Sequence, residues 1–159
     1  MSDNVKVLLV GVGYMGLYYK VLRAMKCEVF AIGRGKESAE KFQQETGCRV
    51  VVGGVESIEP KDVKEVDYAI VATPLDVLKD TCISVLHLGI KNILLEKPAG
   101  LNYKEIKEIS DASYAQKAKV YVAYNRRFYA STEKALEIIR ADGGLRDMHF
   151  EFTEWGERV

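Results

Sequence analysis

Cysteine is scarce in this chain, and no disulfide or metal pattern is visible. The 159 residues include only three cysteines, Cys27, Cys48 and Cys82. Their number is odd and their spacing is wide, so they form neither a CxxC zinc or redox pair nor the framework of a secreted disulfide protein. The predicted compartment is therefore the reducing cytoplasm.

An excess of one charge and long apolar runs are also lacking. Lys and Arg number 23, and Asp and Glu number 23, which gives a formal charge of zero. Such a balance has no electrostatic footprint for nucleic acid or an anionic membrane, so neither is expected as a partner. No run approaches the ~20 apolar residues of a membrane helix. Val5–Val10 is too short for a targeting segment and indicates a buried strand.

Short apolar segments alternate with helix-like segments along most of the chain. The apolar segments are rich in Val, Ile and Leu and have the length of strands covered on both faces. This alternation implies right-handed crossovers and a mostly parallel sheet, so we predict an α/β, doubly wound Rossmann-type domain over residues 1–124. The predicted strands are Val5–Val10, Glu28–Ile32, Arg49–Val52, Asp67–Thr73, Asn92–Glu96 and Val120–Tyr124; the predicted helices are Tyr14–Lys26, Ser38–Thr46, Leu75–Leu88, Tyr103–Lys117 and Thr132–Ala141.

Two local features of the helices are also predicted. In the first helix, Leu17, Val21 and Ala24 share one face. In the fourth, Asn102 is followed three residues later by Glu105, which predicts a box-like N-cap.

The end of the chain has a different pattern. Met148, Phe150 and Phe152 alternate with polar residues, a period of two that describes a strand with one buried and one solvated face. We therefore expect residues 125–159 to hold a connecting helix and, at Leu145–Trp155, the first strand of a second α/β domain that is largely missing from the chain.

A glycine cluster follows the first predicted strand and opens the first helix. Gly11 permits a tight turn, Gly13 lets a pyrophosphate approach the backbone, and Gly16 lets the helix pack close to the strand. The helix N-terminus adds free N–H groups that favour phosphate. A purely structural turn is the alternative. The predicted cofactor-binding residues are Gly11, Val12, Gly13, Tyr14, Met15 and Gly16.

The end of the second predicted strand bears on the choice of dinucleotide. An NAD site usually places an acid about 20 residues after the glycines, bonded to the ribose 2′-OH. That position is Gly33, followed by Arg34, while Glu28 lies at the wrong end of the strand. The planar guanidinium of Arg34, aided by Lys36, can pair with a 2′-phosphate. We predict NADP in preference to NAD, with a solvated loop arginine as the alternative.

Two further strand ends hold candidate site residues. Thr73 and Pro74 end the fourth strand, at the edge where parallel sheets bind ligands, and are expected near the adenosine or ribose. A plain strand-ending proline is the alternative. Glu96, Lys97 and Pro98 end the fifth strand. A desolvated lysine at such an end can act as an acid or base, whereas a loop lysine has no such role.

Four motifs in this order resemble one family. GVGYMG follows the first strand, ATP the fourth, LLEKP the fifth and YNRRF the sixth. Together they look like the N-terminal half of the glucose–fructose oxidoreductase, inositol dehydrogenase and rhizopine-catabolism (Gfo/Idh/MocA) family, over nearly the whole chain. The resemblance implies an NAD(P)-dependent oxidoreductase acting on a sugar, sugar-nucleotide or cyclitol-like hydroxyl or carbonyl. It also implies a C-terminal domain built on an open, largely antiparallel sheet.

The resemblance assigns residue roles as well. Lys97 matches the lysine of the EKP motif, which lies at the junction of nicotinamide and substrate and takes part in catalysis. Glu96 and Pro98 shape that corner, and the Lys97–Pro98 bond is expected to be cis. Asn125 matches a segment near the nicotinamide that leads into the second domain.

Two departures from the family pattern stand out. Many members have a histidine where this chain has Leu78, and the acid/base pair of the family's second domain has no counterpart. His87 and His149 do not supply it and are expected to be structural or solvated.

Three hypotheses about function follow. The chain is the cofactor-binding part of an oxidoreductase in which Lys97 helps move the substrate's hydroxyl proton. Alternatively, it is a non-catalytic NADP-binding or regulatory module, or an inactive truncated fragment. Under the first hypothesis we expect a small polyol or sugar-type substrate, no metal, and little turnover by the 159 residues alone. Association into a homo-oligomer is left open.

Overall fold

The computed structural model describes residues 4–13 and 16–151. Contacts divide the chain into two compact units, Met1–Ala123 and Tyr124–Val159. The sheet of the first unit positions the candidate site.

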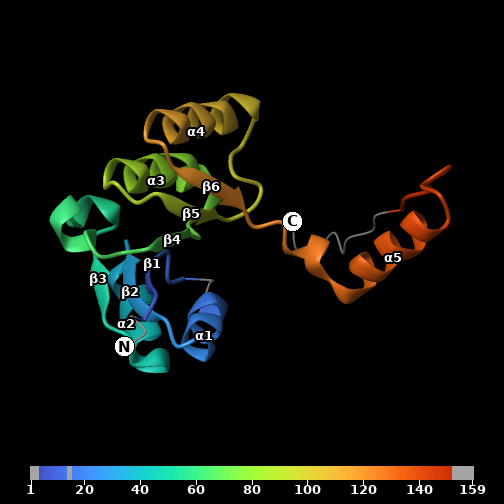
Figure 1. The fold of residues 1–159 in the computed structure, drawn as a ribbon. Coiled ribbons are helices and arrows are strands. Elements are labelled where there is room, and N and C mark those ends of the chain that lie inside the picture. Colours follow the sequence, from blue (N-terminus) through green and yellow to red (C-terminus); the bar gives the residue numbers. More distant parts are fainter. Residues whose placement is uncertain (1–3, 14–15, 152–159) are drawn as a thin grey trace. The chain divides into compact units, whose positions relative to one another are not determined.

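Six strands form one parallel sheet in the first unit (Figure 1). They are β1 (Lys6–Val10), β2 (Glu28–Gly33), β3 (Val50–Val52), β4 (Tyr68–Val71), β5 (Asn92–Leu95) and β6 (Lys119–Val122). Their order is β3-β2-β1-β4-β5-β6, and all neighbouring pairs run parallel. The chain thus winds outward from β1 to β3 and then outward again from β4 to β6. The predicted doubly wound α/β fold is confirmed.

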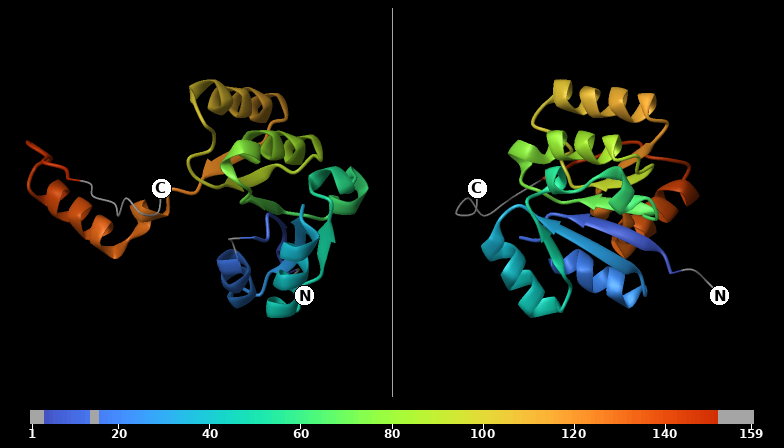
Figure 2. Two further views of the ribbon diagram at one scale, coloured as in Figure 1. Left: turned by 180° about the vertical axis from the view of Figure 1, so that it is seen from behind. Right: turned by 90° about the vertical axis from the view of Figure 1, so that its left-hand side faces the viewer.

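Helices cover opposite faces of the two halves of the sheet (Figures 1 and 2). α1 (Gly16–Ala24) and α2 (Lys36–Thr46) lie on one face, and α3 (Leu75–His87) and α4 (Tyr103–Ala115) on the other. The connection from β3 to β4 holds two short 3₁₀ turns, η1 (Val55–Ser57) and η2 (Pro60–Val63). Within the part of the chain that the structure describes, no helix is both long and apolar enough to cross a membrane.

The core has a layer on each face of the sheet, because successive side chains of a strand point to opposite faces. In β1, Val7 and Leu9 join one layer, and Leu8 and Val10 join the other. The helix side chains of the first layer are Tyr19, Leu22, Ala39 and Phe42; those of the second include Leu78, Cys82, Val85 and Ile109. Burial on both faces explains why the strands have continuous apolar sequences.

The buried face of α1 differs from the predicted one. Leu17 and Val21 are 66% and 57% exposed, whereas Tyr19 and Leu22 are both 7% exposed. Ala24 is exposed as well. The helix is apolar around most of its circumference, so periodicity alone could not select the stripe that meets the sheet. The face that Leu17, Val21 and Ala24 share is therefore not the one that packs against the sheet.

The N-terminus of α4 is capped by Asn102, as predicted. Its side-chain oxygen accepts a hydrogen bond from the Glu105 N–H at 3.1 Å. The Glu105 carboxylate accepts from the Leu101 N–H at 2.7 Å, one residue earlier than a capping box would have it. One helix-end donor, the Glu105 N–H, is thus satisfied, together with the N–H of the residue before the cap.

The second unit contains a 3₁₀ turn, η3 (Asn125–Phe128), and the helix α5 (Ala130–Ala141). Residues 145–151 form no strand, and Met148 and Phe150 are 74% and 73% exposed. A period of two produces a strand only where a neighbouring strand completes the hydrogen-bond ladder, and none of the described strands pairs with this segment. The predicted strand at Leu145–Trp155 is therefore wrong for residues 145–151, and its remainder lies outside the described residues.

Candidate functional site

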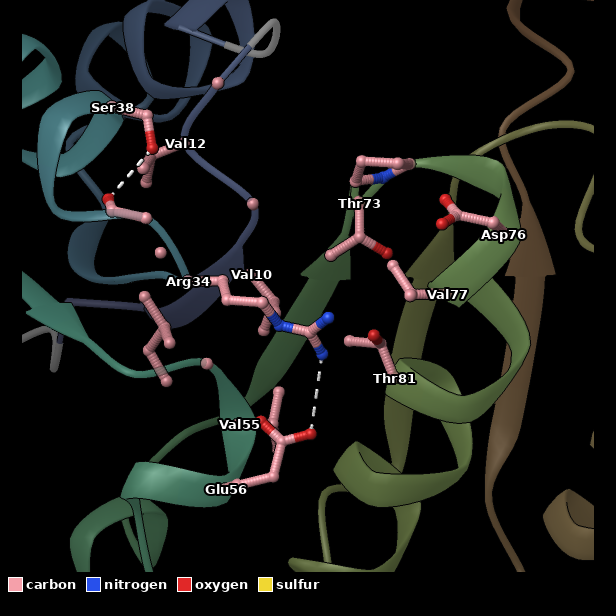
Figure 3. A pocket seen from close by; sticks show the side chains of 17 residues that line it. Val10, Val12, Arg34, Ser38, Val55, Glu56, Thr73, Asp76, Val77 and Thr81 are labelled. Carbon is pink, nitrogen blue, oxygen red and sulfur yellow. Dashed lines mark hydrogen bonds and ion pairs between the residues drawn. The ribbon is translucent and has the colours of Figure 1, made fainter.

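A pocket of about 300 Å³ lies at the carboxyl ends of β1 and β4, where the strand order reverses (Figure 3). Open α/β sheets bind ligands in the crevice at this switch point. The walls come from the turn after β1, the end of β2, the η1 turn and the connection from β4 into α3. The lining residues are Val10, Gly11, Val12, Gly13, Ile32, Gly33, Arg34, Gly35, Ser38, Gly54, Val55, Glu56, Thr73, Pro74, Asp76, Val77 and Thr81.

Gly11 makes the turn after β1 sterically possible. Its φ is +102°, in the left-handed region that favours glycine. A Cβ built there would lie 2.3 Å from the carbonyl oxygen of Ala72, just beyond β4. The Gly11 N–H donates to the Ile32 carbonyl at 2.9 Å. Gly11 therefore closes the base of the pocket.

We expect Gly11→Ala to lower the free energy of unfolding by about 3 kcal/mol or more, because it adds backbone strain and a clash with Ala72. Urea unfolding followed by circular dichroism measures the loss. Gly47→Ala is the matched control, since Gly47 also has a positive φ (+71°) but no atom of the described residues within 4 Å of a Cβ. The control should cost only about 1 kcal/mol. Equal losses would contradict the importance of the contact with Ala72.

Gly13 is exposed and faces open space. Among the residues that the structure describes, no atom lies within 4 Å of a Cβ built at Gly13, and its φ is outside the left-handed region. Packing among the described residues thus does not require glycine there. A bare backbone in a pocket wall fits a ligand that must approach closely, as a pyrophosphate does. Gly33 differs, because a Cβ there would lie 2.6 Å from the side chain of Val12. The lack of a Cβ at Gly33 makes room for the side chain of Val12.

Thr73 contributes a buried polar atom that lacks a hydrogen bond. Among residues 4–13 and 16–151, its Oγ1 is the buried side-chain oxygen or nitrogen without a partner. Leaving such a hydroxyl unsatisfied costs about 1–3 kcal/mol, so its place in the wall of a pocket indicates a polar ligand group. With the open backbone at Gly13, the pocket offers the contacts that a ribose and a pyrophosphate need. The residues present therefore fit a dinucleotide.

Arg34 reaches into the pocket from the end of β2 and faces Glu56 of η1 (Figure 3). Its Nη2 lies 3.7 Å from Oε1 of Glu56, and the two side chains are 64% and 65% exposed. An ion pair exposed to this degree contributes only ~0–1 kcal/mol. The guanidinium can therefore exchange this partner for another anion at little cost.

Glu96 and Lys97 follow β5, the neighbour of β4, and do not line this pocket. The Glu96 carboxylate accepts from the Tyr18 hydroxyl at 2.6 Å and from the Lys97 N–H at 2.9 Å. Burial, and then the bond to Glu96, raises the pKa of Tyr18, so the phenol remains a donor. Tyr18 thereby ties α1 to the turn after β5. The Lys97–Pro98 bond is cis, as expected, but Lys97 is exposed rather than desolvated.

The remaining candidates are placed as follows. Tyr14 and Met15 lie outside the described residues, and α1 begins at Gly16. Asn125 is exposed at the start of η3 in the second unit, so its role stays a prediction. His87 is exposed, and His149 is exposed and 3.6 Å from a carboxylate oxygen of Glu151, as expected for solvated histidines.

The cysteines and the possible metal-ligating side chains are arranged as follows in the described part of the chain. All three cysteines are free thiols, and complete burial raises the pKa of Cys82 to about 12, which keeps it protonated. Across residues 4–13 and 16–151, His, Cys, Asp and Glu side chains form no group of three that could hold a metal ion.

The model of one protein family matches residues 5–124, which is most of the chain. It describes an oxidoreductase family with an NAD-binding Rossmann fold, GFO_IDH_MocA. The chain belongs to the Gfo/Idh/MocA family. The resemblance carried by the four motifs is thereby confirmed.

Known proteins agree with this assignment. An uncharacterized oxidoreductase of Streptococcus pneumoniae is 30% identical over 97% of this chain and 42% of its own length. The WlbA dehydrogenase of Chromobacterium violaceum, solved with NADH and UDP-GlcNAcA, has a TM-score of 0.72 at 17% identity, over 89% of this chain and 41% of WlbA. A mutant of KijD10, a 3-ketoreductase of Actinomadura kijaniata solved with NADP and TDP-benzene, has a TM-score of 0.70 at 16% identity, over 87% and 43%. These two structural similarities show the shared fold, and the chain spans less than half the length of each protein.

Ten residues that line this pocket were not among the predicted site residues, and four of them are polar or charged: Ser38, Glu56, Asp76 and Thr81. Asp76 and Thr81 lie on α3, directly after the predicted Thr73-Pro74 pair, so their proximity to the strand end was the available signal. Glu56 lies in the irregular connection between β3 and β4, which has no periodicity to place it.

Proposed function

We propose that this chain is the cofactor-binding part of a nicotinamide-dependent dehydrogenase or reductase, and that its pocket takes the adenosine and pyrophosphate of NADP in preference to NAD. The observation that carries the proposal is the pairing of an open backbone at Gly13 with the unsatisfied hydroxyl of Thr73 in one pocket at the switch point. Membership of an NAD-binding oxidoreductase family supports it.

Each part of the proposed site has its own role. Backbone N–H groups after β1 and at the start of α1 hold the pyrophosphate, and the Thr73 hydroxyl bonds a ribose oxygen. When bound, the dinucleotide supplies the hydride acceptor or donor. Lys97 holds the proton of the substrate hydroxyl at its Nζ, or returns it, as an acid/base group. Glu96, bonded to Tyr18 and to the Lys97 N–H, orients the turn that bears this lysine.

The proposed substrate is a sugar, sugar-nucleotide or cyclitol-like hydroxyl or carbonyl. The family assignment supports this class, as do the ligand of WlbA and the 3-ketoreductase activity in the name of KijD10. The proposed compartment is the cytoplasm, in keeping with the free thiols. Beyond substrate and cofactor, self-association into a homo-oligomer is the partner interaction that we propose for testing.

Two measurements test the proposed function. Calorimetric titration of the chain with NADPH and NADH should show binding of both. A cofactor-absorbance screen should then find turnover of a polyol or its oxidised form by the chain, or by the longer protein if the reading frame continues past codon 159. Binding without turnover at either length would favour a non-catalytic NADP-binding module, and absence of binding would refute both.

Arg34 is expected to create the preference for NADP. A charge-assisted bond to the 2′-phosphate contributes roughly 1.5–3 kcal/mol to binding. Arg34→Ala should therefore weaken the binding of NADPH by about ten- to a hundredfold. NADH should be nearly unaffected. Competitive fluorescence titration measures both affinities, with Arg49→Ala as a control that removes an exposed arginine outside the pocket. A preference for NADH that survives unchanged in both variants would refute the assignment.

A further inference from the structure

The structure supplies the carboxylate that β2 itself lacks. β2 ends at Gly33 without an acid, at the position from which NAD sites usually bond the ribose 2′-OH. The η1 turn brings Glu56 into the same pocket from a different part of the chain. Its carboxylate lies 3.7 Å from the Arg34 guanidinium, toward which it points (Figure 3).

Backbone hydrogen bonds fix the position of η1 relative to β2. The N–H groups of Gly53 and Gly54 both lie against the Gly33 carbonyl, at 3.0 and 3.3 Å, so the start of η1 is tied to the end of β2. A Cβ at Gly54 would lie 2.5 Å from Oε2 of Glu56 and 3.7 Å from Nε of Arg34. Glycine therefore leaves the space that the acid and the guanidinium share.

We propose that Glu56 is a specificity-determining residue for the dinucleotide, an inference that rests on the proposed function. Its carboxylate pairs with Arg34 and must release the guanidinium before a 2′-phosphate can take it. The phosphate is itself anionic and is repelled by the same carboxylate. NAD presents a 2′-OH, for which a carboxylate is a hydrogen-bond acceptor. Glu56 thus opposes Arg34 and limits the preference for NADP.

The exposure of the pair separates this role from one in folding. Both side chains are about two-thirds exposed, so loss of the pair changes stability little. Removal of the negative charge by Glu56→Gln keeps the size of the side chain. An effect of this variant on ligand choice is therefore a local electrostatic effect.

The experiment compares NADPH, NADH and 2′-AMP binding to the wild-type chain, Glu56→Gln and Glu65→Gln by calorimetry. Glu65 is the matched control, since it is an exposed glutamate of the same connection but pairs with Lys6, at the amino end of β1. Glu56→Gln should raise the affinity ratio of NADPH to NADH about tenfold, as expected for releasing one charge-assisted partner. It should also strengthen 2′-AMP binding, and Glu65→Gln should leave all three affinities unchanged.

A double variant that combines Glu56→Gln with Arg34→Ala shows whether Glu56 changes ligand choice through Arg34. If Glu56 acts through the guanidinium, the gain from Glu56→Gln should shrink to about twofold once Arg34 is removed. An unchanged NADPH to NADH ratio in Glu56→Gln, with both ligands binding, would overturn this inference and leave the proposed function standing. Failure of the wild-type chain and all variants to bind NADPH, NADH or 2′-AMP would overturn both.

Discussion

Replacement of Gly13 by valine is expected to abolish dinucleotide binding while leaving the fold intact. None of the described residues has an atom within 4 Å of a Cβ at this position, so the new side chain meets no described protein group. It would instead occupy the space in which the pyrophosphate approaches the backbone. An overlap of this kind and the loss of the phosphate hydrogen bonds should weaken binding by about a hundredfold or more.

Two measurements on the same sample decide this expectation. Calorimetry reports the loss of NADPH and NADH binding, and urea unfolding should show a change of less than about 1 kcal/mol, as for a surface substitution. Gly13→Ala should give an intermediate loss, because the methyl group is smaller. Gly11→Ala provides the contrasting case, in which stability falls because the Cβ meets the Ala72 carbonyl. Full binding by a folded Gly13→Val protein would place the dinucleotide elsewhere.

The parts of the fold that could be predicted depend on local patterns. Apolar residues follow one another within Lys6–Val10 and Tyr68–Val71 because both faces of the sheet are covered. This property can be recognised in the sequence. The turn after β1 was predictable for a similar reason. Its glycines stand between a strand and a helix, where the geometry of the turn and the space for a ligand require them.

The errors have a common physical origin in long-range contacts. Leu17 and Val21 have the spacing of a packing face, but the sheet selects the stripe with Tyr19 and Leu22. Met148 and Phe150 alternate like strand residues, but no described strand pairs with them. In both cases the local pattern is present, but an element elsewhere in the chain determines which face packs or whether a strand forms.

The candidate site shows the same division. Gly13, Arg34 and Thr73 follow directly from strand ends, so their positions in the pocket could be inferred from the sequence. Glu56 could not, because it enters through a 3₁₀ turn whose attachment to Gly33 is a backbone interaction without a sequence signature. The end of β2 has no acid, and η1 brings one into the same pocket from another segment.

Lys97→Ala is expected to lower kcat by about 10²–10⁴ in whichever length of the protein turns over a polyol or its ketone, since this is the usual contribution of a general acid or base. The affinity for NADPH should change far less than kcat, because Lys97 lies outside the pocket that would hold the adenosine and pyrophosphate. Steady-state rates by cofactor absorbance and calorimetric affinities separate the two quantities. Retained turnover in the variant would remove Lys97 from the acid/base role.

A chemical readout tests the position of Lys97 in the 159-residue chain itself. Lys97 is exposed, so acetic anhydride should acetylate its Nζ, and mass spectrometry reports the extent at each lysine. NADPH should protect Lys97, whereas 2′-phospho-ADP-ribose, which lacks the nicotinamide, should not. Lys107 is the internal control, because it is exposed on α4 and paired with Asp111, away from the pocket residues. Equal protection by both ligands, or by neither, would mean that the nicotinamide does not reach the turn after β5, and the proposed proton transfer by Lys97 would then lose its geometric basis.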